Sequence, residues 1–229
     1  MLSLNKRPVG LYELDRTGLV WAKGAGFMTK GEHTRREIVR KAAPLFNQKG
    51  YEGTSLADLM KATGLQKGGI YRHFSGKQEL AGEAFDYAWD QAVSGRLDGV
   101  AEVENAVDRL KKVVGNFVER RAGLVPGGCP LMNTAVEADD GNKVLRARAR
   151  KALQNWTRRL CNITAEGIKK EEIDAGVNPL ELAQLIIGSL EGALLISRLQ
   201  NDDQPLRRAC EHLEKYLEQG VRAKNATAR

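Results

Sequence analysis

The stretch GLQKGGIYRHFSGKQEL, residues 64–80, interrupts a chain that is otherwise patterned for amphipathic helices. Gly68 and Gly69 follow Lys67 directly, although glycine weakens the interior of a helix by about 1 kcal/mol relative to alanine. Lys77 stands just inside what reads as the start of a new helix, where the helix dipole disfavours a positive charge. Both features indicate that something outside the fold compensates for them.

Capping patterns place two helices close to this stretch. Residues 34–37 (TRRE) form a capping box ahead of apolar residues at helical spacing, and Gly50 supplies a stop. Residues 55–58 (SLAD) open a second, short helix that Gly64 ends. The apolar face of the second helix is expected to pack against the first.

The stretch itself supplies a third helix, between residues 66 and 73, and the start of a fourth at a capping box of residues 75–78. A short helix, a glycine turn and a second short helix, with a preceding helix packed across both, form a helix-turn-helix unit. We therefore expect this unit at about residues 55–74, within a domain of residues 28–92.

The rest of the chain predicts five more helices and no strand. They are expected near residues 103–122, 130–138, 142–172, 179–200 and 204–221. Asn178 followed by Pro179 is a cap with proline at the first helical position, which marks the start of the fourth of these. The predicted fold is all-α with about nine helices, and residues 93–229 form a C-terminal domain.

The composition describes a chain that builds its own core. A length of 229 residues needs no disulfide for stability, and the three cysteines are far apart without CxxC spacing. The three histidines are equally scattered, so neither a metal nor another cofactor is expected. No signal-peptide core and no run of membrane-spanning length is found, which predicts a cytoplasmic protein without a membrane partner.

The net charge of +7 lies in the first third of the chain. Residues 28–80 carry ten Lys and Arg against five Asp and Glu, and residues 1–27 carry four against two, whereas the remainder is balanced. A basic head on a neutral body fits a module that binds a polyanion. An ordinary solvated face is the plainer explanation of the charge alone.

The chemistry of residues 66–73 suits double-stranded DNA. The third helix of such a unit enters the major groove, where Lys67 would donate to guanine and Gln66 would read an adenine. Gly68 and Gly69 have no side chain to hold the backbone away from the base pairs. Polar side chains that suit phosphate oxygens follow: Tyr71, Arg72 and His73.

Lys77 gives a second indication of DNA, because a phosphate that docks at the start of its helix would offset the unfavourable charge. By the same reasoning, Thr54 and Ser55 at the start of the second helix form another phosphate site. The alternative is that both hydroxyl residues only cap the helix and that Lys77 is free in solvent.

These residues resemble the DNA-binding signature of TetR-type (tetracycline repressor-like, AcrR-type) transcriptional regulators. The match covers about residues 34–80 and consists of Gly50-Tyr51, Thr54-Ser55-Leu56, Asp58-Leu59, Ala62, Gly64-Leu65, Lys67-Gly68, Ile70-Tyr71, His73-Phe74, Lys77 and Leu80. The resemblance implies an all-α homodimer that binds a palindromic operator on bacterial nucleoid DNA, usually as a repressor. It also implies release when a small-molecule inducer enters the C-terminal domain.

The resemblance implies base contacts from Lys67 and Gly68. It implies phosphate contacts from Thr54, Tyr71, His73 and Lys77. Gln66 stands where the family usually has a serine or threonine cap, Met60 stands where alanine is usual, and Arg72 is a variable position. These departures leave the operator sequence open.

The last two predicted helices resemble the family's four-helix dimer interface. Residues 179–200 carry a broad apolar stripe with small residues that allow close helix approach. The candidate interface residues are Leu180, Ile187, Gly188, Leu190, Leu194, Leu195, Leu206, Leu213 and Tyr216. The alternative is that both helices bury the core of their own subunit.

The ligand pocket of such regulators lies among the middle helices. The candidate lining residues are Phe117, Cys129, Met132, Trp156 and Leu160, each of which is otherwise plain core. Cys129 precedes Pro130 at a helix N-terminus, where a thiol with a lowered pKa would react with oxidants or electrophiles. The alternative is that Cys129 is a small buried hydrophobe.

Two other classes of protein are alternatives to a ligand-controlled repressor. An enzyme is disfavoured, because the chain has no Gly-rich phosphate loop, no HExxH and no GxSxG motif, so no catalytic residue is expected. An activator or architectural DNA-binding protein without ligand control stays open. Residues 1–27 lie outside the resemblance and are an upstream start, a flexible basic arm or an ordered addition.

Overall fold

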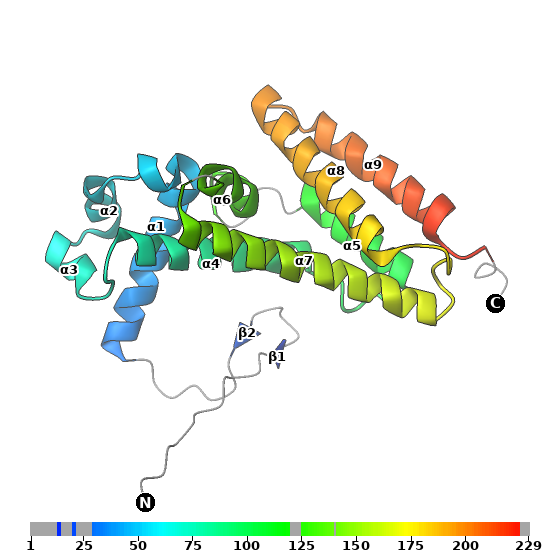
Figure 1. Ribbon diagram of the computed structural model, residues 1–229, viewed down its shortest axis with the longest axis horizontal. Coiled ribbons are helices and arrows are strands. Elements are labelled where there is room, and N and C mark those ends of the chain that lie inside the picture. Colours follow the sequence, from blue (N-terminus) through cyan, green and yellow to red (C-terminus); the bar gives the residue numbers. More distant parts are fainter. Residues whose placement is uncertain (1–12, 15–19, 22–28, 120–124, 140, 225–229) are drawn as a thin grey trace, which may run out of the picture.

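The computed structural model describes residues 13–14, 20–21, 29–119, 125–139 and 141–224. Its helices are α1 Lys30–Gly53, α2 Leu56–Thr63, α3 Lys67–Tyr71, α4 Lys77–Arg96, α5 Ala106–Glu119, α6 Pro130–Ala138, α7 Lys143–Lys169, α8 Pro179–Gln200 and α9 Gln204–Tyr216. A π-helical turn, η1 Leu217–Val221, continues α9. The predicted all-α fold is confirmed (Figure 1).

One short strand pair was not predicted. β1 Glu13–Leu14 and β2 Val20–Trp21 pair antiparallel within the N-terminal extension. The other residues of segment 1–27, and with them the three roles considered for it, lie outside the described residues.

The start of α1 lies earlier than predicted. Thr29 is the N-cap, and its hydroxyl oxygen accepts from the backbone N–H of Glu32 at 3.2 Å while the Glu32 carboxylate accepts from the backbone N–H of Thr29 at 2.8 Å. The predicted capping box at residues 34–37 is wrong, because the Thr34 hydroxyl donates to the carbonyl of Lys30 inside the helix at 2.9 Å. Gly50 interrupts the helix as predicted, with φ at 76°.

The start of α4 also uses different partners from those predicted. Gly76 is the N-cap and has no side chain to donate or accept, and the hydroxyl and backbone N–H of Ser75 instead donate to the Glu79 carboxylate at 2.7 and 2.6 Å. Gln78, the expected partner in a capping box, donates to Asn142, the N-cap of α7, at 3.0 Å. A carboxylate is the stronger acceptor, which explains why Glu79 replaces Gln78.

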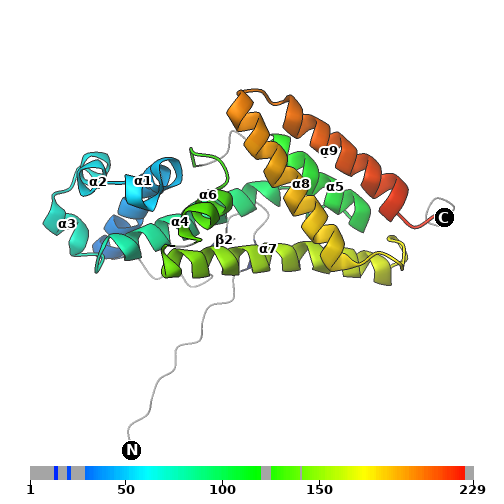
Figure 2. The same ribbon diagram turned by 45° about the horizontal axis from the view of Figure 1, so that its top comes forward.

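Two hydrophobic cores are joined by the long helix α4. The first core lies among α1, α2, α3 and the first half of α4, and its fully buried side chains include Ile38, Leu59, Ile70 and Leu80. The second core lies among α5, α7, α8 and α9 and includes Trp156, Leu110 and Leu190. Figures 1 and 2 show α1–α3 at one end of the molecule, α8 and α9 at the other, and α7 running along the length between them.

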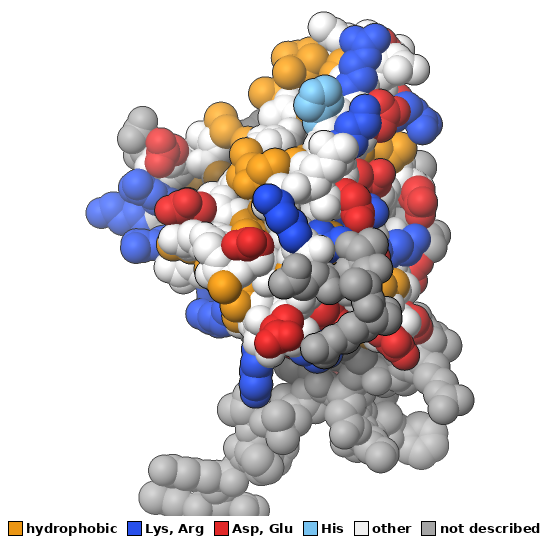
Figure 3. Space-filling model, turned by 90° about the vertical axis from the view of Figure 1, so that its right-hand side faces the viewer, with side chains coloured by type: hydrophobic (Ala, Val, Ile, Leu, Met, Phe, Trp, Pro, Cys, Tyr) orange, Lys and Arg blue, Asp and Glu red, His pale blue; other side chains and the backbone are white. Residues whose placement is uncertain are grey.

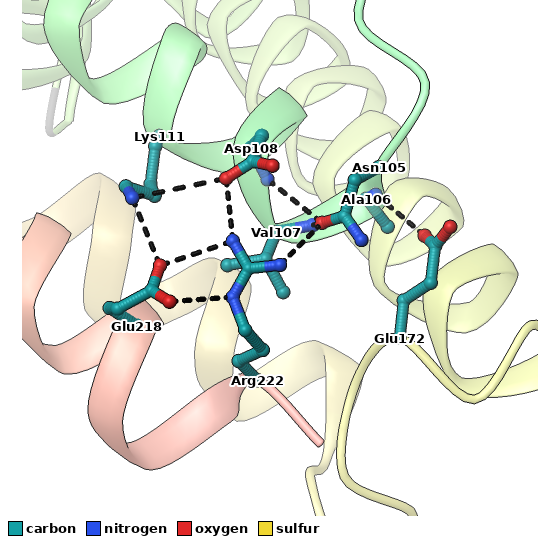
Figure 4. A network of polar contacts seen from close by, with 8 residues as sticks. All are labelled: Asn105, Ala106, Val107, Asp108, Lys111, Glu172, Glu218 and Arg222. Carbon is teal, nitrogen blue, oxygen red and sulfur yellow. Dashed lines mark hydrogen bonds and ion pairs between the residues drawn. The ribbon is translucent and has the colours of Figure 1, made fainter. Parts of the chain in front are cut away.

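The C-terminal turn is tied to the start of α5 by a polar network (Figure 4). Arg222, just after η1, donates to Asp108 at 2.6 Å and to Asn105 at 3.2 Å, and pairs with Glu218 at 2.8 Å. Lys111 donates to the same Glu218 at 3.0 Å. This network closes the second core at the end where α5 begins.

Helix α8 is long and apolar enough to cross a membrane by length and composition, with a mean hydropathy of 1.5 over its most apolar window. A helix that packs on the core of a soluble protein has the same composition. In α8, one face packs on the second core, as Leu182, Ile186 and Leu190 show with exposures of 4% or less. This burial gives the apolar run a role inside the fold.

Candidate nucleic-acid interface

Helix α3 presents its N-terminus to solvent. Gln66 is the N-cap residue and makes no capping hydrogen bond, so its amide stays available. Gln66, Lys67 and Gly68 are all exposed, whereas Ile70 is fully buried and fixes the helix to α1 and α4. The exposed end therefore consists of the residues that the sequence predicted to meet base edges.

The fold itself does not require glycine at position 68. A Cβ atom at Gly68 would meet nothing within 4 Å, and one at Gly69 would lie at an ordinary 3.4 Å from Leu65. Gly64 differs, because it ends α2 with φ at 74°, a conformation that favours glycine. The described part of the chain thus gives no packing reason for the absence of a side chain at Gly68.

The structure separates Thr54 from Ser55. Thr54 is fully buried, and its hydroxyl donates to the carbonyl of Gly50 at 2.6 Å. The phosphate contact expected of the Thr54 hydroxyl does not fit this position, because the group is used to close the kink of α1. Ser55 is exposed and caps α2 in a capping box with Asp58, as predicted.

Lys77 lies against an aromatic ring. Its Nζ atom is 4.4 Å from the ring centre of Tyr51, and this ring stacks on Phe46 at 6.4 Å. A cation over an aromatic face is stabilised by the ring quadrupole, so Tyr51 holds the ammonium beside the first turn of α4. Tyr71 and His73 are half-buried and Arg72 is exposed in the turn between α3 and α4.

Helix α6 connects this domain to the rest of the subunit. The carboxylate of Glu137 in α6 accepts from the backbone N–H groups of Tyr51 and Glu52 at 2.8 and 2.9 Å. A Cβ atom at Gly50 would come within 2.6 Å of the same carboxylate. The kink at Gly50 therefore both exposes two N–H donors and leaves room for their acceptor.

A second set of hydrogen bonds holds the start of α6 against α1. Asn47 of α1 donates to the carbonyls of Pro126 and Gly128 at 2.9 and 3.1 Å. Asn133 of α6 donates to the backbone carbonyl of Asn47 at 2.9 Å and to that of Gly127 at 2.9 Å. Sequence reasoning missed both asparagines, because the bonds that join α1 to the start of α6 link residues 79 to 86 positions apart in the chain.

The predicted pocket residues divide into two groups. Phe117, Cys129, Trp156 and Leu160 are buried in the second core, whereas Met132 is 36% exposed on α6. Three of the buried four surround the guanidinium of Arg96, with Cys129 Sγ at 3.3 Å and the ring centres of Phe117 and Trp156 at 4.2 and 5.7 Å.

The reactivity expected of Cys129 is not favoured by its surroundings. Burial raises the pKa of the Cys129 thiol to about 11, although Arg96 beside it acts in the opposite direction. Of the two alternatives for Cys129, the structure supports the small buried residue, because the effect of desolvation on the thiol pKa outweighs that of Arg96. The thiol is instead a contact of a buried ion pair, Arg96 with Glu191 of α8, which sequence reasoning did not find.

The predicted dimer residues also divide. Ile187, Leu190, Leu194, Leu206 and Leu213 are buried in the core of the subunit, which corrects their placement at an interface. Leu180, Gly188, Leu195 and Tyr216 are exposed as an interface requires. Three further exposed apolar side chains of α8 were missed: Leu185, Ile196 and Leu199.

The exposed apolar residues form one face of α8. Figure 3, which looks at the end of the molecule that holds α8 and α9, shows apolar side chains gathered on the upper part of this surface. Gly188 and Gly192 lie on α8 with open space where a Cβ atom would be. A second helix could therefore approach α8 closely here.

Comparisons with known proteins agree with this arrangement. Residues 38–84 match the family described as bacterial regulatory proteins, tetR family, and residues 106–213 match the tetracyclin repressor-like C-terminal domain. The chain is 30% identical to the transcriptional repressor ComR of Escherichia coli (strain K12), over 72% of this chain and 79% of that protein. It is 25% identical to the transcriptional repressor DhaR of Mycobacterium sp. (strain GP1), over 75% and 86%.

Solved structures give the same result over a larger share of the chain. A TetR transcriptional regulator from Chloroflexus aurantiacus J-10-FL is 41% identical with a TM-score of 0.82, covering 86% of this chain and 100% of that one. A regulator of the TetR family from Cytophaga hutchinsonii is 36% identical with a TM-score of 0.81, covering 87% and 100%. The chain is therefore a transcriptional regulator rather than an enzyme, and it belongs to the TetR family.

Proposed function

We propose that this regulator is a repressor, which binds a palindromic operator as a homodimer and leaves it when a small molecule binds in the second core. The observation that carries the DNA contact is the exposed N-terminus of α3, where the Gln66 side chain makes no capping hydrogen bond and a Cβ atom at Gly68 would meet no described atom within 4 Å. The first residues of such a helix are the ones that reach base edges in the major groove.

The phosphate contacts are assigned to the side chains around this end. Tyr71 ends α3, Arg72 and His73 follow it, and Lys77 is held at the first turn of α4 by Tyr51. Ser55 adds a phosphate contact at the start of α2. Thr54 is not assigned a phosphate contact, because its buried hydroxyl donates to the carbonyl of Gly50. Lys67, Gln66, Gly68 and Gly69 lie where base contacts are expected.

The homodimer is assigned to the exposed face of α8 together with Tyr216 of α9. Leu195, Ile196 and Leu199 are 54%, 47% and 79% exposed, which is unusual for neighbouring large apolar side chains on one helix. Two-fold symmetry through this face would place two copies of α3 at successive turns of one DNA helix, about 34 Å apart.

Control by an inducer is assigned to the contacts that link the second core, through α6, to the start of α2. Cys129 touches the buried pair and is the N-cap of α6, and Glu137 near the end of α6 holds the backbone just before α2. A movement of α6 would therefore reach the start of α2 through two backbone hydrogen bonds. An activator without ligand control would show the same DNA contacts but no response through this route.

The operator assignment is tested with the DNA upstream of the protein's own gene. Its affinity for the purified protein is compared with that of a scrambled duplex at one fixed, near-physiological salt concentration. A preference of about a thousandfold or more is expected for a sequence-specific regulator. Equal binding to both duplexes would contradict regulation of its own gene through sequence reading.

A further inference from the structure

The ion pair in the second core is incomplete. Arg96 of α4 and Glu191 of α8 are 8% and 5% exposed in their side chains, and a single contact joins Nη2 to Oε1 at 2.9 Å. Among the residues that the structure describes, the Nη1 atom of Arg96 and the Oε2 atom of Glu191 are buried and have no hydrogen-bond partner. A buried guanidinium and carboxylate usually pair through both atoms, so each group here keeps one unused hydrogen-bonding position.

Aromatic side chains surround this pair. The guanidinium carbon of Arg96 lies 4.2 Å from the ring centre of Phe117, 5.1 Å from that of Trp89 and 5.7 Å from that of Trp156. The two tryptophans meet edge to face at 6.4 Å. The setting combines flat apolar surfaces with one free donor and one free acceptor, a combination that small-molecule sites use to fix orientation.

We propose that this cluster recognises the inducer, and that the inducer is a flat, neutral aromatic molecule with a hydrogen-bond acceptor beside a donor, as in a primary aromatic amide. The acceptor would take the free N–H of Arg96, and the donor would meet the free oxygen of Glu191. The inference rests on the proposed ligand control and names the class of ligand for it.

The charge of the pair argues for a neutral ligand. Arg96 and Glu191 balance each other, so a carboxylate on the ligand would face Glu191 and an ammonium group would face Arg96 in a desolvated site. A neutral amide satisfies both free atoms without adding charge. Neither an acceptor alone nor a donor alone can do so, which predicts a preference for molecules that offer both.

The cluster also touches the element that leads to the DNA-binding domain. Cys129 Sγ lies 3.3 Å from Arg96 Nη2 and 3.1 Å from Glu191 Oε1, so a ligand at the pair must move or press against this thiol. Because Cys129 is the N-cap of α6, its displacement shifts the helix that carries Asn133 and Glu137. Occupation of the cluster thereby loosens the hold on α1.

The test uses benzamide as the probe, with acetophenone and benzoate as matched molecules that lack the donor or carry a charge. Binding to the purified protein without DNA is measured by calorimetry and by tryptophan fluorescence at pH 7. Benzamide is expected to bind at least tenfold more tightly than either of the others. Equal or weaker binding of benzamide would overturn the proposal.

Two variants separate recognition from support of the fold. Glu191→Gln removes the free carboxylate oxygen and is expected to reduce the affinity for benzamide at least tenfold with little change for acetophenone. In the double variant Arg96→Met/Glu191→Leu, apolar side chains of similar size replace the pair, an exchange that buried ion pairs often tolerate. It is expected to fold, as judged by thermal unfolding, and to bind benzamide and acetophenone equally.

A preference for benzamide that persists in the double variant would overturn the assignment to this pair. If a variant does not fold, the three probes on the unaltered protein still test the proposal, because equal or weaker binding of benzamide overturns it. Failure of the operator assignment is distinguishable, because it appears in the DNA titration alone and leaves the three probe affinities unaffected.

Discussion

The carboxylate of Glu137 accepts the backbone N–H of Tyr51 at 2.8 Å, although the two residues are 86 positions apart in the chain. The aromatic ring of the same tyrosine lies against the ammonium group of Lys77. Tyr51 alone thus separates Glu137, a residue of the C-terminal domain, from Lys77, a candidate phosphate contact.

Replacing Glu137 with alanine is expected to lower the free energy of unfolding by about 1 kcal/mol, because two N–H donors lose a charged acceptor at an exposed position where water can take its place. It should also weaken operator binding, since the backbone ahead of α2 is no longer held. Urea unfolding and DNA titration measure the two effects. Val136→Ala is the control, because Val136 is 74% exposed on the same helix and its loss should cost little.

Alanine at Lys77 or at Tyr71 is expected to weaken binding to every duplex, whereas Lys67→Ala should also reduce the discrimination between operator and scrambled DNA. Loss of the charged phosphate contact of Lys77 should also lower the slope of log affinity against log salt by about 1, whereas loss of the neutral hydroxyl of Tyr71 should leave this slope unchanged. Lys215→Ala on α9, at the opposite end of the molecule, is the control. Equal affinity of Lys77→Ala and the unaltered protein at low salt would refute a phosphate contact at α4.

Two glycines are expected to respond oppositely to alanine. Gly68→Ala should leave stability unchanged or slightly raised, because the position is open and helical, but should reduce operator affinity. Gly50→Ala should destabilise the fold, because φ is 76° and the new Cβ would meet Glu137 at 2.6 Å. Thermal unfolding and DNA titration distinguish them. Unchanged operator affinity of Gly68→Ala would remove the argument for close backbone approach.

A charge on the exposed face of α8 is expected to prevent dimer formation. Leu195→Glu should shift the protein to a monomer in sedimentation experiments and reduce operator affinity, because one half-site is then read alone. Leu153→Glu on α7, where the side chain is 42% exposed, is the matched control and should leave the oligomeric state unchanged. A Leu195→Glu protein that sediments like the control would place the dimer contact elsewhere.

Acid should weaken the joint between α1 and α4. Hydrogen bonds from Ser75, followed by the guanidinium of Arg35, lower the pKa of Glu79 from 4.5 to about 2. A depressed carboxyl pKa contributes stability above the unfolded value, and this contribution is lost as the pH falls from 4.5 towards 2. Glu79→Gln should therefore be less stable at pH 7 and should converge with the unaltered protein near pH 2, as urea unfolding at several pH values can show. Glu211→Gln on α9 is the control.

Local patterns predicted most of the fold because their partners are adjacent in the chain. The capping box of Ser55 and the cap at Asn178 were read correctly for this reason. The start of α1 was misplaced because Thr29 and Thr34 each precede a glutamate by three residues, and only the path of the backbone decides which hydroxyl caps.

Contacts between distant segments escaped prediction. In the sequence, Arg96 looks like an ordinary basic residue at the end of a helix, and Glu191 looks like an isolated charge in an apolar run. Only the packing of the helices brings these two residues, 95 positions apart, together. The apolar residues of α8 encircle much of the helix. The sequence pattern therefore could not show that Ile187 is buried and Leu195 is exposed. The charge pattern and the glycines of α3, in contrast, were readable directly.

The contacts of Arg222 hold the end of the last helical turn against the start of α5. Because this guanidinium joins the last turn to Asp108 and Asn105, a chain cut before residue 222 would lose these two contacts with the start of α5, although it would keep the helices α1–α9 and the bond between Lys111 and Glu218. For anyone who shortens the protein for crystallisation or fuses a label to it, the usable junction lies beyond this arginine.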